Sequence, residues 1–177
     1  RTEDSDFVVS SHHDFHPTDV LEAGDGSLLV VDTGGWYKLC CPTSQLYKPD
    51  VLGAIYRVRR TENKRVGDPY GNAIAWESLS PSDLSKLLED DRHRVRGLAV
   101  QVLADKGQSA LTDMKRAWDS AHDSTRLKQQ ILWSLTRMPL LEAREMARNG
   151  LQDDDVNVVR TAVHAVGVHH DGEALPI

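Results

Sequence analysis

The stretch "GDGSLLVVDTGGWYKLCCPTSQLYKPDVLGAIYRVRR", from Gly24 to Arg60, decides how the first third of the chain folds. Its Asp25-Gly26 dipeptide is a strong hairpin signal, because glycine tolerates the positive φ that a tight turn requires. The continuous apolar run at 27–31 predicts a strand buried on both faces. A long loop then leads to a further predicted strand at 53–59, in which apolar and basic residues alternate.

Two shorter β-rich runs come before this stretch, at 7–10 and 20–22. So few strands leave open sheet edges and cannot bury both faces of a sheet. The chain also begins with Arg1 rather than methionine. We therefore expect it to be a piece of a larger protein.

From about residue 80 onward the pattern is helical and repeats. Asp91, Asp123 and Asp155 stand 32 residues apart, with apolar residues at fixed offsets around them, which is typical of an internal repeat. We predict that each Asp caps the helix that follows it. A basic residue five positions after each Asp is predicted to reach an Asp of the neighbouring repeat; these residues are Arg96, Lys128 and Arg160. Residues 80–168 should then form stacked antiparallel helix pairs.

Residues 61–79 connect the two parts and are rich in turn residues. We predict that they form a strap, which docks Ile74, Trp76 and Leu79 on the first helix. Pro81 suits the first helical position, where its missing N–H costs nothing, so Ser80 or Ser82 should be the cap.

The composition of the 177 residues excludes some functions. A net charge of −6 argues against broad nucleic-acid binding, which needs a basic face to release counterions from phosphates. The basic residues cluster at Arg57, Arg59, Arg60, Lys64 and Arg65. The alternation at 55–59 predicts that Arg57 and Arg59 face solvent on one side of the strand. The sequence has no apolar run long enough to span a membrane and no visible signal peptide.

The cysteines, Cys40 and Cys41, are adjacent. Adjacent cysteines cannot form a C-x-x-C-H haem attachment or a C-x-x-C redox pair. Three states stay open: a vicinal disulfide, disulfides to cysteines outside this chain, and free thiols.

The residues 7–60 resemble the last blade of a β-propeller of the glucose/sorbosone dehydrogenase type. The motif D-G-S-L-x-V-x-D at 25–32 is common to many propellers, whereas "DTGGWYKLCCPTSQ" followed by "GAIYRVRR" is more specific. The resemblance extends to large exported bacterial proteins described as membrane-bound dehydrogenases. In these proteins HEAT repeats follow the propeller, often with a cytochrome c domain after them. The motif D-x-x-x-V-R-x-x-A at 91–99 is similar to the second helix of such repeats.

Two groups of polar residues are candidate sites. His12, His13 and His16 lie close together in "SHHDFHPTD" and are candidates for metal ligands, against the alternative of a polar loop between blades. Asp19 and Asp32 are catalytic candidates, because the resemblance implies that such strand ends line the mouth of a central channel. The alternative, which we favour, is that both carboxylates bind backbone N–H groups and fix turns.

The sequence thus predicts an α+β fragment with three parts: residues 1–60, a partial propeller blade; 61–79, a strap; and 80–177, HEAT-like repeats of which the last is truncated. The resemblance implies a periplasmic or otherwise exported parent that oxidises sugars or alcohols, with a quinone cofactor and calcium, and with haem c in another domain. We expect no cofactor in this chain itself. Its partners would be the remaining blades and other proteins on the helical surface. The alternative function is a non-enzymatic scaffold that binds protein or polysaccharide.

Overall fold

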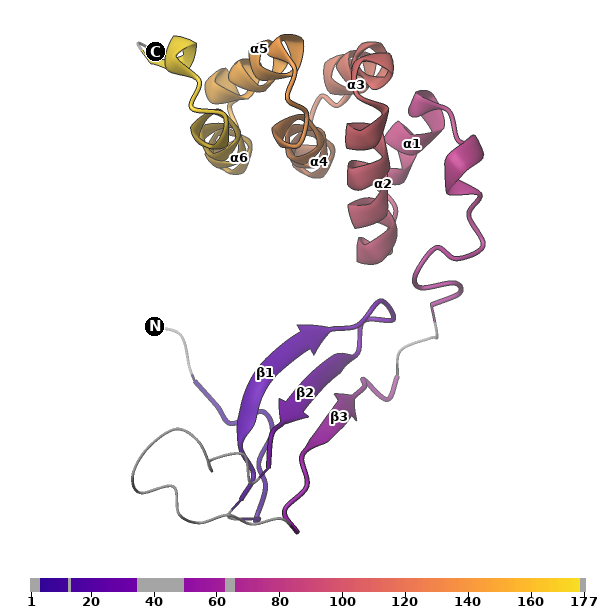
Figure 1. Cartoon of the computed structure of the whole chain (residues 1–177), viewed down its shortest axis with the longest axis vertical. Coiled ribbons are helices and arrows are strands. Elements are labelled where there is room, and N and C mark those ends of the chain that lie inside the picture. The colour runs from indigo at the N-terminus through magenta and orange to yellow at the C-terminus, as the bar shows by residue number, and fades with distance from the viewer. Residues whose placement is uncertain (1–3, 13, 35–49, 63–65, 176–177) are drawn as a thin grey trace. The chain divides into compact units, whose positions relative to one another are not determined.

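The computed structural model describes residues 4–12, 14–34, 50–62 and 66–175, and shows a mixed α and β chain (Figure 1). The chain divides into two compact units, Arg1–Arg65 and Val66–Ile177. All described strands belong to the first unit, and all described helices belong to the second. The residues 66–79 of the predicted strap therefore belong with the helices.

The first unit contains a three-stranded antiparallel sheet in the order β1-β2-β3, which does not close on itself. Its strands are β1 (Pro17–Glu22), β2 (Leu28–Asp32) and β3 (Ala54–Val58). The predicted strands at 20–22, 27–31 and 53–59 are confirmed within one to three residues at each end. The β-rich run at 7–10 forms bends and no strand, so it adds nothing to the sheet.

The predicted Asp-Gly hairpin joins β1 to β2. Gly26 has φ +75° and its N–H donates to the Ala23 carbonyl at 2.9 Å, which closes the turn. In β2 the side chains of Val30 and Asp32 are buried, whereas Leu28, Leu29 and Val31 are only half-buried. The prediction of a strand buried on both faces is therefore wrong for the described residues, because no described layer covers the sheet fully.

The described residues of the second unit form six α-helices and three short 3₁₀ helices (Figure 1). The α-helices are α1 (Pro81–Leu87), α2 (His93–Lys106), α3 (Gln108–Ser120), α4 (Thr125–Thr136), α5 (Leu141–Asn149) and α6 (Val156–Val168). The 3₁₀ helices are η2 (Trp76–Ser78), η3 (Gly150–Gln152) and η4 (Gly172–Ala174). As predicted, Pro81 opens α1 and Ser80 caps it by accepting the N–H of Asp83.

One apolar core runs through all six α-helices. Its largest fully buried side chains include Leu84, Leu103, Met114, Ile131 and Leu135. Helix α4 packs on α2, α5 and α6, so it lies in the middle of the helical unit. In Figure 1, α4 and α6 are seen end-on whereas α2 lies across the view. Helix α2 is therefore not parallel to α4 and α6, which departs from a regular stack.

The predicted Asp caps are only partly right. Asp155 is the cap of α6 and accepts the N–H of Asn157 at 2.7 Å. The caps of α2 and α4 are instead Arg92, without a side-chain hydrogen bond, and Ser124, which accepts the N–H of Leu127. Measured from cap to cap, the helices are therefore 32 and then 31 residues apart. The helix cap is the residue after the repeating Asp in α2 and α4, but it is the Asp itself in α6. The 32-residue spacing of the Asp residues does not reveal this difference.

Candidate functional site

Asp32 lies at the end of β2 with only 7% of its surface exposed. Its Oδ1 accepts two backbone N–H groups, from Gly34 at 2.9 Å and from His16 at 3.0 Å. These hydrogen bonds, that of Gly34 first, hold the pKa of Asp32 below its usual value, because they stabilise the charged form. Asp32 thus ties the segment before β1 to the turn after β2, as the structural alternative predicted.

The turn after β2 depends on a close approach between two backbone segments. Gly34 has φ +59°, and a Cβ added there would lie 2.7 Å from the Gly53 nitrogen. A Cβ added at Gly53 would lie 2.5 Å from the Asp32 carbonyl oxygen. Only glycine fits at these two positions, so the chain before β3 passes directly against the end of β2.

Asp19 is exposed on β1, and its side chain accepts the N–H of the next residue, Val20, at 2.8 Å. Pro17 pairs with Asp32 and Asp19 pairs with Val31, with an irregularity in register between them. The structure therefore places the two candidate carboxylates on adjacent strands but gives each a separate backbone role.

The histidine candidates bind the backbone of their own loop. His12 accepts the N–H of Asp14 through Nδ1 at 3.2 Å, and His16 Nδ1 lies 3.0 Å from the Asp14 carbonyl oxygen. His13, Cys40 and Cys41 lie outside the described residues. Among the residues that the structure describes, no three His, Cys, Asp or Glu side chains form a group that could hold a metal.

The hairpin turn carries a polar cluster that the sequence reasoning missed. Asp25 accepts the hydroxyl of Ser27 at 2.5 Å and forms ion pairs with Arg57 and Arg59, both at 3.3 Å. The Ser27 hydroxyl first, and then the Ser27 N–H, lower the pKa of Asp25. The Asp-x-Ser spacing at the turn and the alternating arginines of β3 together could have indicated this contact. Both arginine side chains are exposed, as predicted, and they fasten the hairpin turn.

Apolar side chains are exposed on both faces of the sheet. Cross-strand neighbours share a face, so Val20, Val30 and Tyr56 lie on one face, and Val31 and Ile55 lie on the other. The exposed fractions are 57% for Val20 and 45% for Tyr56 on the first face, and 69% for Ile55 on the second. Leu21, which shares the second face with its partner Leu29, is 49% exposed.

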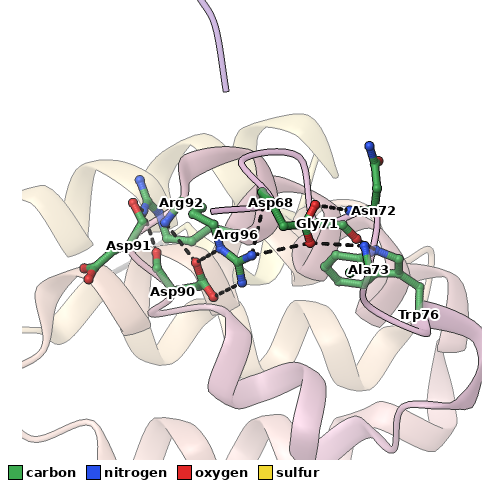
Figure 2. A network of polar contacts seen from close by, with 9 residues as sticks. All are labelled: Asp68, Gly71, Asn72, Ala73, Trp76, Asp90, Asp91, Arg92 and Arg96. Atoms are coloured by element: carbon green, nitrogen blue, oxygen red, sulfur yellow. Dashed lines mark hydrogen bonds and ion pairs between the residues drawn. The ribbon is translucent and has the colours of Figure 1, made fainter. Parts of the chain in front are cut away.

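A polar network fastens the strap to α2 (Figure 2). The guanidinium of Arg92 donates to both carboxylate oxygens of Asp90 at 2.8 Å and to the Asp68 carbonyl at 3.0 Å. The Asp68 carboxylate in turn accepts the N–H groups of Asn72 and Ala73. Arg92 is the main cause of the lowered pKa of Asp90. The network orders the chain just before η2.

Two of the three apolar residues of the strap pack against the helical core, and docking of all three on the first helix stays a prediction. Trp76 and Leu79 are partly buried against the helical core. The indole N–H of Trp76 donates to the Gly71 carbonyl at 2.9 Å. A Cβ added at Gly71 would lie 3.0 Å from the Trp76 ring and from Val95 and 3.4 Å from Ile74, so all three side chains surround this glycine.

Among the described residues, one of the three predicted basic residues, Lys128, forms an ion pair with an Asp of the neighbouring repeat. Lys128 on α4 donates to Asp153, before α6, at 2.7 Å, and both side chains are largely buried. Beside it, the Thr125 hydroxyl donates to Asp155. Arg96 donates instead to the carbonyls of Asp90 and Asp91 in its own turn. The partner of Lys128 is thus two residues away from the repeating Asp.

Comparisons with family models, with curated proteins and with solved structures found no match to this chain. Within the described part of the chain, no helix is long and apolar enough to cross a membrane.

Proposed function

We propose that this chain is a binding module of an exported propeller–HEAT protein, in which the sheet docks between neighbouring β-layers and the helical unit recognises protein. The observation that carries the proposal is the exposure of apolar side chains on both faces of the sheet, at Val20, Leu21, Ile55 and Tyr56.

An antiparallel sheet that faces water normally alternates apolar and polar side chains, so that one face is solvated. Here one face carries the apolar cross-strand row of Val20, Val30 and Tyr56. The other face carries two apolar cross-strand pairs, Val31 with Ile55 and Leu21 with Leu29, and the third strand adds a charged residue to each, Asp19 and Arg57 respectively. Exposed apolar surface of this kind is typical of interaction sites. A blade between two neighbouring blades would have both faces covered, which agrees with the resemblance of residues 7–60 to a propeller blade.

The resemblance further implies a parent that oxidises sugars or alcohols. We propose that such chemistry depends on groups other than Asp19 and Asp32. Both carboxylates already accept backbone N–H groups. Among the described residues, no group of three or more His, Cys, Asp or Glu side chains could hold a metal ion.

The docking proposal is tested with variants that make each sheet face polar while keeping β-propensity. Val20→Thr/Tyr56→Thr changes one face and Leu21→Thr/Ile55→Thr changes the other, with Leu98→Thr on α2 as the matched control for an exposed apolar residue. We expect the unchanged chain to bind a hydrophobic dye and to self-associate in sedimentation experiments. Each double variant should reduce both signals, and the control should not. A monomer without dye binding, or equal signals in all variants, would contradict the proposal.

A further inference from the structure

The outer side of α6 carries an apolar groove of about 660 Å³. Three valines of α6 line it, Val159, Val163 and Val166, together with Leu151 and Leu175. Val163 is 54% exposed and Leu175 is 79% exposed.

In α2 and α4, the residues at the same distance from the helix cap as Val163 are buried. Val163 is the eighth residue after the cap of α6, and the eighth after the caps of α2 and α4 are Val100 and Leu132. Their exposed fractions are 4% and 0%. Three residues further on, Leu135 of α4 is fully buried, whereas Val166 of α6 is half-buried. The same side of the helix is therefore core in α4 and surface in α6.

Leu132 is covered by the elements that follow it in the chain. A Cβ added at Gly150 in η3 would lie 3.3 Å from the Leu132 methyl groups and 2.9 Å from Ala162 of α6. Helix α4 packs against both α5 and α6. A helix pair is thus what closes this side of α4.

Helices α4 and α6 can also be compared at a polar position, the fifth residue after the helix cap. Gln129 is the fifth residue after the cap of α4, and its amide donates to the Asn157 carbonyl at 3.2 Å and to the Thr161 hydroxyl at 3.1 Å, both on α6. The fifth residue after the cap of α6 is Arg160, which is exposed and, within the described part of the chain, has no hydrogen-bond or ion-pair partner. Arg160 can only donate, so a partner must offer it oxygen acceptors.

We propose that the groove formed by Val159, Val163 and Val166 binds an amphipathic helix pair from a protein partner, packed as α5 and α6 pack on α4. The partner's helix pair presents small residues to the valines, as Gly150 of η3 lies against Leu132. Its first turn offers carbonyl, hydroxyl or carboxylate oxygens to Arg160. The inference rests on the proposed binding function and names the chemistry of the partner that the helical unit recognises.

The probe is a fluorescein-labelled peptide of residues 139–170, which contains the helix pair that already makes this interface with α4. Its binding to the 177-residue chain is followed by fluorescence anisotropy. We expect saturable binding, weakened about tenfold or more by Val163→Asp, which corresponds to the loss of one buried anchor. Leu98→Asp is the matched control, because Leu98 is an exposed apolar residue on another helix, and it should leave binding unchanged.

Circular dichroism and urea unfolding establish that each variant is folded. Absence of saturable binding, or equal binding by the Val163→Asp variant, would overturn the proposal. If Val163→Asp instead dissociated a dimer and the peptide did not compete for that surface, the occupant would be a second copy, and the proposal would also fail. None of these outcomes depends on the sheet, so they are distinguishable from failure of the sheet-docking proposal.

Discussion

At the scale of single residues, Asp32 shows how a strand-end carboxylate can hold two backbone segments together. One carboxylate oxygen organises two backbone segments, and it is shielded from water. A carboxylate that accepts backbone N–H groups is stabilised in its charged form, which is why its pKa is lowered.

We predict that Asp32→Ala destabilises the first unit more than Asp32→Asn at pH 7, because asparagine keeps an acceptor oxygen. Since the folded-state pKa of Asp32 is lowered, its stabilising contribution is complete above its unfolded-state pKa of about 3.9 and is lost as the pH falls through the folded-state pKa. The difference between wild type and Asp32→Asn in urea unfolding should therefore shrink below about pH 4. Asp19→Asn is the control and should change little. A difference that is constant with pH would contradict a role for the charge.

Gly34 and Gly26 allow a second residue-scale prediction, because both have positive φ but different surroundings. A Cβ at Gly26 would meet nothing within 4 Å, whereas one at Gly34 would meet backbone at 2.7 Å. Gly26→Ala should cost about 1 kcal/mol of unfolding free energy from backbone conformation alone. Gly34→Ala should cost about 2 kcal/mol more. Equal losses in urea titrations would mean that the close approach of Gly34 to Gly53 is not tight in solution.

At the scale of elements, the helices are held in place by polar contacts between turns as well as by the apolar core. Lys128, in the first turns of α4, pairs with Asp153, which lies just before α6, and their side chains are 17% and 10% exposed. The ammonium of Lys128 also lies 5.9 Å from the centre of the Trp118 ring. Ion pairs shielded from solvent couple more strongly than exposed ones.

We predict a coupling free energy of about 1–2 kcal/mol between Lys128 and Asp153 in a double-mutant cycle with Lys128→Met and Asp153→Asn. The control cycle uses Lys86 and Asp83, whose side chains are 73% and 50% exposed, and it should give a much smaller coupling. Thermal unfolding of the four proteins of each cycle gives the values. Similar coupling in the two cycles would show that burial does not strengthen the inner pair.

The strap is the second element whose position depends on polar contacts (Figure 2). Arg92→Ala removes the donor to Asp90 and to the Asp68 carbonyl. We predict faster hydrogen exchange at the amides of Asn72 and Ala73, which bind the Asp68 carboxylate, with little change in α4. Arg116→Ala is the control, because Arg116 is 75% exposed in its pair with Asp113. Unchanged exchange at 72–73 would mean that Trp76 packing alone orders the strap.

At the scale of the whole molecule, the two units present different surfaces. The sheet exposes apolar side chains on both faces, and the helical unit has a continuous core with an open groove at α6. We propose binding for both units, and we expect any dehydrogenase chemistry of a parent protein to need groups from other parts of it.

We predict that the purified chain does not oxidise sugars or alcohols when it is supplied with an artificial electron acceptor, a quinone cofactor and calcium. The reason is that Asp19 and Asp32 are committed to backbone N–H groups. Dye reduction is the readout, with an established quinoprotein dehydrogenase as the positive control. Substrate-dependent reduction that Asp32→Asn abolishes without unfolding the chain would prove the expectation wrong.

The sequence by itself determined the local structure of this protein. Asp25-Gly26 closes the hairpin, Ser80 and Pro81 begin α1, and the 32-residue period locates α2, α4 and α6. These features were predictable because each depends on a backbone preference or on a periodicity within a few residues.

Only the tertiary structure decided which side chains of different helices and strands contact one another. The cap of α6 is Asp155 whereas the cap of α4 is Ser124, and Lys128 pairs with Asp153 rather than with the repeating Asp. The same holds for Asp32, whose partner His16 lies 16 residues away. The physical reason is that such contacts depend on how helices and strands pack at distances of a few ångströms. A shift of one residue between repeats is small in the sequence, but it changes every side chain that a helix presents to its neighbour.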